Sequence, residues 1–457
     1  MKDKTKLAAF AIAGALTLAA CGGAGAAATT TQPPEPVTTT TVETMDDDMT
    51  DETTDEMDDG MGEPTRFLIE IANVSSGFLA RTADVFAIPV GADEPAPAFP
   101  GDSYAWTFAA SPGERLSFAT MLVQSNDWFF APGAEGVALF DDAGNPLVGD
   151  ITEQISLWDA GTEADQAPGV GEDQAPRQSG PDTGDVDPDT TVRMVEDRDV
   201  AEYVTVSLSH DGTEFTLTIE NISEGAATPS PIAPGIGVLH NAGTPIFEER
   251  AAEGGYGLEA LAEDGDPSRL VEWIISQSGV TTPFAPGVAI ALDHGSTLFV
   301  AGSDDTGEGL EALAEDGDPG VLAASSGGTA FAVPSGATDP GPLFPGQSYT
   351  VEIDAAPGHY LTFATMFVQS NDWFFSLGEG GIELFGTDGS PISGDITDQV
   401  TLWDAGTEVN QISGIGSDQA PRQAGPNTGD TDPDSTIRIV EGYAPGSYIQ
   451  ITITPQG

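Results

Sequence analysis

The sequence predicts an all-β protein with two tandem antiparallel β-sandwich domains and short helices in an insertion of the second domain. Short runs that alternate apolar and polar residues recur along the 457 residues, and Gly, Pro, Asn and Asp separate them. The sequence shows no long amphipathic helix and no alternation of strands with helices, the pattern typical of a parallel α/β sheet. Antiparallel sandwiches are therefore favoured.

A 61-residue stretch, 118–178, returns without a gap as 363–423. The two copies are identical at 39 of these 61 positions. The identical segments include SNDW, GDIT, LWDAGTE and DQAPRQ, which are polar and mostly acidic. A packing requirement alone would preserve only the apolar character, so the repetition indicates that both copies need these polar segments.

Residues 1–20 have the pattern of a signal peptide. Three lysines precede the apolar run Leu7–Leu18, which is too short to span a bilayer. The tetrapeptide Leu-Ala-Ala-Cys that ends at Cys21 resembles the lipobox of bacterial lipoproteins. This resemblance implies lipidation of Cys21 and an extracytoplasmic protein anchored to the cell membrane. The alternative is an ordinary signal peptide followed by an incidental cysteine.

Residues 21–64 are predicted to form a disordered tether after the lipidated cysteine. They are rich in Ala, Thr and Pro and then in Met, Asp and Glu, and they contain no aromatic residue. Such a composition cannot bury enough apolar surface to fold. We expect the tether to hold the folded domains away from the membrane.

The chain is strongly acidic, with a formal net charge of −61. All its lysines lie in the signal peptide, so ten arginines face 73 acidic residues from Cys21 onward. This charge repels nucleic acid and anionic lipid headgroups and so disfavours both as partners. Two interpretations of the acidity remain open: adaptation to a salty habitat, which would explain most of the carboxylates, and metal binding by the few that recur at fixed spacing.

The domain boundaries follow from a second sequence match. Residues 65–75 (TRFLIEIANVS) match 213–223 (TEFTLTIENIS), and both segments alternate like a strand. Taken as the opening strands, they predict domain 1 at 65–210 and domain 2 at 211–457. The offset of this match is shorter than that of the 61-residue repeat, which predicts an insertion at about 224–325 in domain 2.

The insertion contains its own repeat. The segment GLEALAEDGDP occurs at 257–267 and again at 309–319. LEALAE predicts a short helix, which Asp-Gly-Asp-Pro would end because Gly allows a left-handed cap and Pro prevents continuation. A metal-binding loop is the less favoured interpretation of this acidic segment.

The repeated acids form a candidate metal site in each domain. Asp127 follows a predicted strand, and Asp159 and Glu163 flank an Ala-Gly turn after another strand; loops at one end of a sandwich converge. Clustered carboxylates repel one another unless a cation neutralises them, and Ca²⁺ accepts several oxygen ligands. No His or Cys recurs with them, which disfavours zinc, iron and copper. The alternative is that the aspartates only cap turns. The equivalent acids of the second copy are Asp372, Asp404 and Glu408.

The paired motifs SNDWFF and LWDAGTE resemble those of the spondin N-terminal (F-spondin) domain. The similarity extends over most of 65–200 and 213–445. It implies a C2-like β-sandwich that holds one Ca²⁺ per domain through the first acid of each motif and the acid after the Thr: Asp127, Asp159 and Glu163, and Asp372, Asp404 and Glu408. Asn126 and Asn371 replace a Pro of animal members, and Glu163 and Glu408 replace an Asp. The neighbouring tryptophans, Trp128, Trp158, Trp373 and Trp403, are expected in the core or the wall of a cleft.

Two further repeated features have other expected roles. Arg177 and Arg422, in DQAPRQ, are expected to form an ion pair with a carboxylate that is buried or lies in a cleft. The D-x-D-x-D segments that begin at Asp185 and Asp430 have a Glu at the twelfth place, as in an EF-hand, but they lack the Gly at the sixth place. We expect these segments to form solvated acidic turns, with a secondary metal site as the alternative.

These observations favour a calcium-binding, non-catalytic adhesion or ligand-binding protein at the cell surface, with an extracellular glycan or protein as its ligand. Two alternatives remain. One is a structural envelope or stalk protein without a specific ligand. The other is a metal-dependent hydrolase, although no His recurs and neither a nucleophile motif nor a phosphate-binding loop is present in the sequence.

Overall fold

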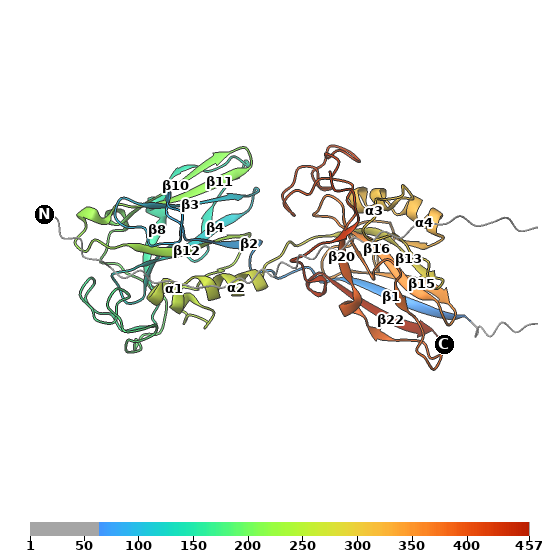
Figure 1. The fold of residues 1–457 in the computed structure, drawn as a ribbon, viewed down its shortest axis with the longest axis horizontal. Helices are drawn as coiled ribbons and strands as arrows, with labels where there is room; N and C mark the ends of the chain where they lie inside the picture. Colours follow the sequence, from blue (N-terminus) through green and yellow to red (C-terminus); the bar gives the residue numbers. More distant parts are fainter. Residues whose placement is uncertain (1–63, 457) are drawn as a thin grey trace, which may run out of the picture. The chain divides into compact units, whose positions relative to one another are not determined.

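The computed structural model describes residues 64–456 and consists mainly of antiparallel strands. The all-β, two-sandwich class predicted from the sequence is confirmed. Each sandwich pairs a four-stranded sheet with a larger sheet (Figure 1). No helix in residues 64–456 has the length and apolar character needed to cross a membrane. The predicted signal peptide, Cys21 and nearly all of the tether lie outside the described residues.

The first sandwich is built from residues between β2 and α2. Its larger sheet has the order β2-β12-β4-β5-β8-β9, with β6 paired to β4, and its smaller sheet has the order β3-β11-β10-β7. The strands are β2 (Thr82–Phe86), β3 (Ser103–Ala109), β4 (Arg115–Leu122), β5 (Trp128–Pro132), β6 (Val137–Ala138), β7 (Gly149–Asp150), β8 (Ile155–Asp159), β9 (Arg193–Met194), β10 (Val204–Asp211), β11 (Glu214–Asn221) and β12 (Ile232–His240), and the helices are α1 (Leu258–Asp264) and α2 (Ser268–Ser276).

The second sandwich repeats this plan. Its larger sheet has the order β14-β13-β16-β17-β20-β21, with β18 paired to β16, and its smaller sheet has the order β15-β1-β22-β19. The strands are β1 (Thr65–Asn73), β13 (Phe284–Leu292), β14 (Thr329–Phe331), β15 (Ser348–Ala355), β16 (Tyr360–Phe367), β17 (Trp373–Ser376), β18 (Ile382–Glu383), β19 (Gly394–Asp395), β20 (Thr401–Asp404), β21 (Arg438–Ile439) and β22 (Ile449–Gln456), and the helices are α3 (Leu310–Asp316) and α4 (Gly320–Ser326).

The larger sheet of each sandwich is buried on both faces. In the first sandwich, Phe118 and Phe130 pack in the core shared with the smaller sheet. Their neighbours Ala119 and Phe129 point the other way and pack with apolar residues of α1 and α2. Figure 1 shows these helices alongside β12 and β2. This double burial explains why β4 and β5 are almost continuously apolar in sequence.

The predicted LEALAE helices are confirmed as α1 and α3. Gly265 and Gly317, at their C-terminal caps, adopt the left-handed conformation (φ 67° and 69°), as expected of the Asp-Gly-Asp-Pro segment.

The strand pairing differs from the expected domain division at the two matched strands. β11 does not open the second sandwich: it forms a hairpin with β10 through a two-residue turn at Gly212, so the expected boundary after residue 210 falls inside this hairpin. β1 does not pair within the first sandwich: it lies between β15 and β22 of the second. A sequence match identifies equivalent strands, but it does not say which copy supplies their partners.

The segment expected as an insertion of the second domain, about 224–325, is divided between the sandwiches. β12, α1 and α2 complete the first sandwich, and β13, α3 and α4 complete the second. The first sandwich is therefore a circularly permuted version of the second, placed in the chain between β1 and β13.

Candidate functional site

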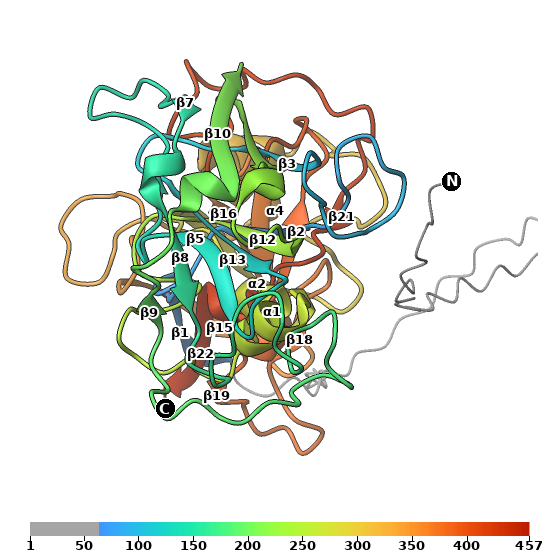
Figure 2. The same cartoon turned by 90° about the vertical axis from the view of Figure 1, so that its left-hand side faces the viewer.

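Hydrogen-bonded strands bring Asp127 and Asp159 together. Asp127 directly precedes β5, and Asp159 is the last residue of β8, which pairs with β5 (Figure 2). The backbone N–H of Ala160 donates to the Asp127 carbonyl at 3.1 Å. Asp372 and Asp404 have the same arrangement beside β17 and β20.

The DAGTE turn holds one oxygen of Asp127. Asp127 Oδ2 accepts hydrogen bonds from the Thr162 N–H (2.8 Å), the Thr162 hydroxyl (3.2 Å) and the Glu163 N–H (3.2 Å). The turn needs Gly161, because its φ is +68° and a Cβ there would lie 2.7 Å from the Thr191 carbonyl oxygen. In the second sandwich, Asp372 Oδ2 accepts the same three bonds from Thr407 and Glu408.

The other oxygen of each aspartate has no partner. Asp127 and Asp372 are completely buried, and Oδ1 of each makes no hydrogen bond. Burial raises the pKa of Asp127 to about 6 and that of Asp372 to about 7, despite the backbone donors that favour the charged form. A buried carboxylate oxygen without a partner costs about 1–3 kcal/mol or more. In both sandwiches the aspartate is thus held through one oxygen, and the other is left without a partner.

Asp159 lies close to both an acid, Asp127, and a cation, Arg193. Its Oδ1 accepts from the Gly161 N–H at 2.8 Å, and its Oδ2 lies 2.6 Å from the guanidinium of Arg193. Burial, reinforced by the charge of Asp127, raises the pKa of Asp159 to about 8. Burial also raises the pKa of Asp404, while Asn410, Gly406 and Arg438 act against the rise.

Glu163 is not one of the carboxylates that form the close group with the two aspartates. The carboxylate oxygens that lie within 4.8 Å of one another come from Asp127, Asp159 and Asp165. Glu163 is buried; its Oε2 accepts from the Asn126 amide at 3.1 Å, and its Oε1 has no partner. Its carboxylate packs against Gly184, where a Cβ would overlap it. In the second sandwich, neither carboxylate oxygen of Glu408 has a partner.

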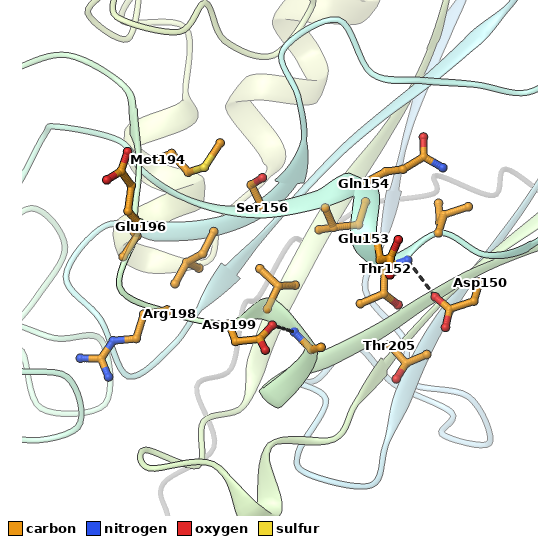
Figure 3. Close-up of a pocket in the computed structure, with 16 residues that line it drawn as sticks. Asp150, Thr152, Glu153, Gln154, Ser156, Met194, Glu196, Arg198, Asp199 and Thr205 are labelled. Carbon is orange, nitrogen blue, oxygen red and sulfur yellow. Dashed lines mark hydrogen bonds between the residues drawn. The ribbon is translucent and has the colours of Figure 1, made fainter.

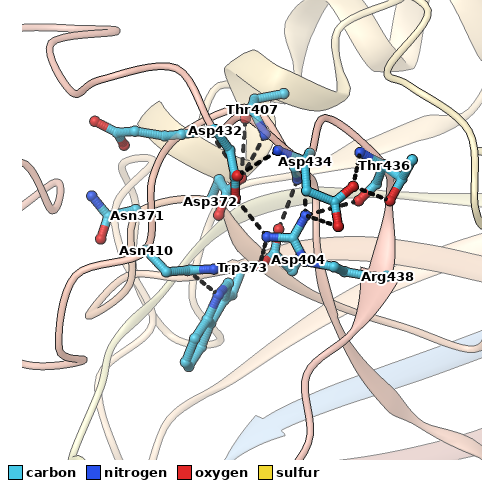
Figure 4. Close-up of polar contacts among 12 residues, drawn as sticks. Asn371, Asp372, Trp373, Asp404, Thr407, Asn410, Asp432, Asp434, Thr436 and Arg438 are labelled. Carbon is cyan, nitrogen blue, oxygen red and sulfur yellow. Dashed lines mark hydrogen bonds and ion pairs between the residues drawn. The ribbon is translucent and has the colours of Figure 1, made fainter.

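The arginines at these sites are Arg193 and Arg438. Arg193 lies 2.6 Å from both Asp159 and Asp187, and Arg438 lies 2.9 Å from Asp404 and 2.6 Å from Asp432 (Figure 4). Neither arginine is among the candidate residues predicted from the sequence. The sequence does repeat them: TVR, which ends at Arg193, returns 245 residues later as TIR, which ends at Arg438, and both lie outside the 61-residue repeat.

The expectation that Arg177 and Arg422 pair with buried carboxylates is wrong. Within residues 64–456 neither forms an ion pair. Arg177 instead donates to the Gly171 carbonyl (2.6 Å) and the Gln124 side chain (2.8 Å), and it contacts Gln174, which is completely buried. The DQAPRQ segment thus stabilises its own loop through these hydrogen bonds. Its last residue reaches helix α1, where the Gln178 amide donates to Asp264 at 2.6 Å.

The remaining repeated segments are structural turns. In GDIT, Asp150 accepts from the Thr152 N–H at 2.8 Å, and the Thr152 hydroxyl accepts from the Val206 N–H at 2.9 Å. In the D-x-D-x-D segment, Asp189 caps a turn through Thr191, while Asp187 is buried against Arg193. The four tryptophans of the repeats are buried, as expected: Trp128, Trp158, Trp373 and Trp403.

A second group of acids lies near the first. Carboxylate oxygens of Asp182, Glu259 and Glu263 lie within 4.8 Å of one another. Glu263, on α1, is 3% exposed; burial raises its pKa to about 8, and Glu163 and Glu259 add to the rise. The equivalent Glu315 has a pKa raised to about 7, again mainly by burial. The sequence favours helix termination for this segment, with a metal-binding loop as the less favoured interpretation.

The first sandwich also has a surface pocket of about 770 Å³ beside the GDIT turn (Figure 3). Its lining includes Asp150, Glu153, Ser156, Glu196 and Arg198. The figure shows Arg198 extending away from the other labelled polar groups. The pocket lining contains neither His nor Cys, and its acids do not form one of the three-carboxylate groups.

Comparison with known proteins adds no family assignment. No protein-family model matches the chain, and a search of curated proteins gives no match.

Proposed function

We propose that this protein is a calcium-binding, non-catalytic adhesion or ligand-binding protein with two spondin-like domains, anchored to the cell membrane through lipid on Cys21. The anchor rests on the lipobox-like sequence, and the spondin-like character rests on the paired motifs SNDWFF and LWDAGTE. An extracellular glycan or protein is the proposed ligand.

The buried, unpartnered Oδ1 of Asp127 and of Asp372 carries the metal proposal. Each belongs to a carboxylate whose other oxygen is fixed by three donors of the adjacent turn. A cation bound at this oxygen would supply the missing partner. The neighbouring atoms that could act as metal ligands are carboxylate oxygens, which are the ligand type that Ca²⁺ binds.

The local charge supports a cation as well. In the first sandwich, oxygens of Asp127, Asp159 and Asp165 lie within 4.8 Å of one another, and the cation Arg193 is ion-paired with Asp159 and with a fourth acid, Asp187. One arginine cannot neutralise four carboxylates. Three formal negative charges remain at this site if all four acids are ionised, which a divalent cation would reduce.

Thermal unfolding of the metal-free protein, with and without Ca²⁺ at moderate salt, tests the metal proposal. We expect Ca²⁺ to raise the melting temperature, and the double variant Asp127→Ala and Asp372→Ala to lose this response. Glu153→Gln with Asp398→Asn is the matched control, since these equivalent acids are exposed and distant from the site. An unchanged melting temperature for the wild-type chain on addition of Ca²⁺ would refute the metal proposal.

Arrays of glycans and matrix proteins, probed with calcium present, test the adhesion proposal. Binding that requires Ca²⁺ and is lost in the double variant would support it. An array without signal would favour a structural envelope protein. Turnover of a glycan or phosphoester that Asp404→Ala abolishes would instead indicate a hydrolase.

A further inference from the structure

The two candidate cation sites differ at one position. Asp165 in the first sandwich is aligned with Asn410 in the second, 245 residues later. Asp165 is exposed, and one of its oxygens lies within 4.8 Å of oxygens of Asp127 and Asp159. Among the residues that the structure describes, no group of three acids of this kind occurs in the second sandwich.

Asn410 is hydrogen-bonded in a way that opposes ligation. Its Nδ2 donates to Asp404 Oδ2 at 2.5 Å, and its Oδ1 accepts from Trp373 Nε1 at 2.6 Å (Figure 4). The amide thus occupies an oxygen of Asp404, and the tryptophan occupies the amide oxygen. In the first sandwich, Trp128 Nε1 has no hydrogen-bond partner.

The first site also carries more negative charge than the second. Asp165 adds a carboxylate beside Asp127 and Asp159 in the first sandwich, whereas the neutral Asn410 stands at the equivalent position in the second; the arginines Arg193 and Arg438 are equivalent. A cation at the second site would therefore meet one formal negative charge fewer. It would also have to displace the Asn410 amide from Asp404.

A second position shows the same exchange of acid for amide. Asp182, which belongs to the group with Glu259 and Glu263, is aligned with Asn427. The Asn427 Nδ2 donates to Glu311, the equivalent of Glu259, at 2.5 Å. At both positions the second sandwich uses an internal amide donor where the first leaves an exposed carboxylate.

We propose that the first sandwich binds a divalent cation more tightly than the second, and that Asp165 and Asn410 set the difference. This inference rests on the proposed calcium binding and extends it: Ca²⁺ fills the first site at concentrations that leave the second largely empty. Ligand charge tunes calcium affinity over several decades, so we expect a difference of about tenfold or more.

The test is a titration of the full mature chain, freed of metal, with Ca²⁺ by calorimetry and with Tb³⁺ by tryptophan-sensitised luminescence. Trp128 and Trp373 adjoin the two sites and make the luminescence local. The wild-type chain should show one tight and one weak step. Asp127→Ala should remove the tight step and Asp372→Ala the weak one, with circular dichroism to verify the fold.

Reciprocal exchanges then test the two residues. Asp165→Asn should weaken the tight step about tenfold or more and leave the weak one unchanged. Asn410→Asp should strengthen the weak step, and the double exchange should again give one tight and one weak step. Glu153→Gln is the charge control.

Two results would overturn the inference, and they are distinguishable. Two steps of equal affinity, insensitive to both exchanges, would refute the assigned difference and leave calcium binding in place. A wild-type chain that binds neither ion would refute the proposed calcium binding together with this inference.

Discussion

At the scale of single residues, each candidate site is a buried carboxylate that the protein satisfies only halfway. Three donors fix Asp127 Oδ2, and Oδ1 has none. The hydrogen bonds that cap the turn use only Oδ2, so capping alone does not explain why Oδ1 is buried without a partner. The acids that follow in the chain add charge around this oxygen, and Arg193 offsets part of it.

Glu263 predicts a pH dependence. Its pKa is about 8 in the folded protein and about 4.3 in the unfolded chain. The protonated acid thus stabilises the fold fully below pH 4, and this contribution is lost as the pH rises through 8. With a chelator present to remove metal ions, the free energy of unfolding of the wild type should fall between pH 6 and 9, relative to that of Glu263→Gln.

Chemical denaturation of the two proteins at several pH values measures this difference. Glu272→Gln, an exposed acid on the neighbouring α2, should follow the wild type throughout. A constant difference between Glu263→Gln and the wild type across this range would contradict the raised pKa.

Gly184 predicts a steric effect. A Cβ at this position would overlap the buried carboxylate of Glu163, which would have to leave its place. We expect Gly184→Ala to lower the free energy of unfolding by about 1–3 kcal/mol. Gly180→Ala in the same loop has room for its methyl group and is the control. Equal stability of the two variants in urea would show that Glu163 does not lie against Gly184.

At the scale of elements, the loop that carries the acids is fastened to the sheet and to a helix. The Ala164 N–H donates to the Asp185 carbonyl at 2.7 Å, and Gln178 reaches Asp264 on α1. The Arg193 guanidinium joins the end of β8 to the Asp187 segment. The loop geometry therefore depends on these polar contacts more than on apolar packing.

Arg193→Gln should have two opposite effects. It leaves Asp159 and Asp187 without their cation, so the metal-free protein should lose about 1–3 kcal/mol of stability. It also increases the net negative charge, so the apparent calcium affinity of the first site should rise. Arg250→Gln, at an exposed arginine, should change neither quantity. A weakened calcium affinity in Arg193→Gln would contradict this assignment of charge.

The sequence predicted the strands, the short helices and the pair Asp127–Asp159, because alternation, Gly caps and strand ends are local signals. It did not predict the role of Asp165 or of Arg193. Both depend on contacts between distant segments, although the Asp165 exchange to Asn410 was visible in the alignment of the two copies. Arg177 shows the converse: its repeated charge predicts an ion pair, whereas in the structure its guanidinium donates to carbonyl and amide oxygens.

At the scale of the whole molecule, the chain order and the sheet order disagree. β1 is hydrogen-bonded on both sides to strands of the second sandwich, and the first sandwich follows it in the chain. The predicted tether precedes β1 in the sequence, so the proposed membrane anchor at Cys21 would be connected to the second sandwich first. The sequence match predicts that β1 and β11 are equivalent strands. It does not predict which strands they pair with, because pairing depends on contacts between distant segments.

Deletion of residues 65–73 should therefore destabilise the second sandwich selectively. We expect amide hydrogens of β15 and β22 to lose protection from exchange, because β1 is their shared neighbour. Amides of β3 and β10 should keep their protection. Loss of protection in β3 and β10 alone would mean that the N-terminal strand pairs within the first sandwich.

The most direct test of the central claim is a crystal structure of the protein grown with Ca²⁺, with the ion identified by its anomalous signal. The account predicts an ion about 2.3–2.6 Å from Asp127 Oδ1, with Asp159 and Asp165 among its other ligands. Well-ordered density without an ion at saturating Ca²⁺, with Asp127 Oδ1 bonded to a protonated neighbouring acid, would contradict it.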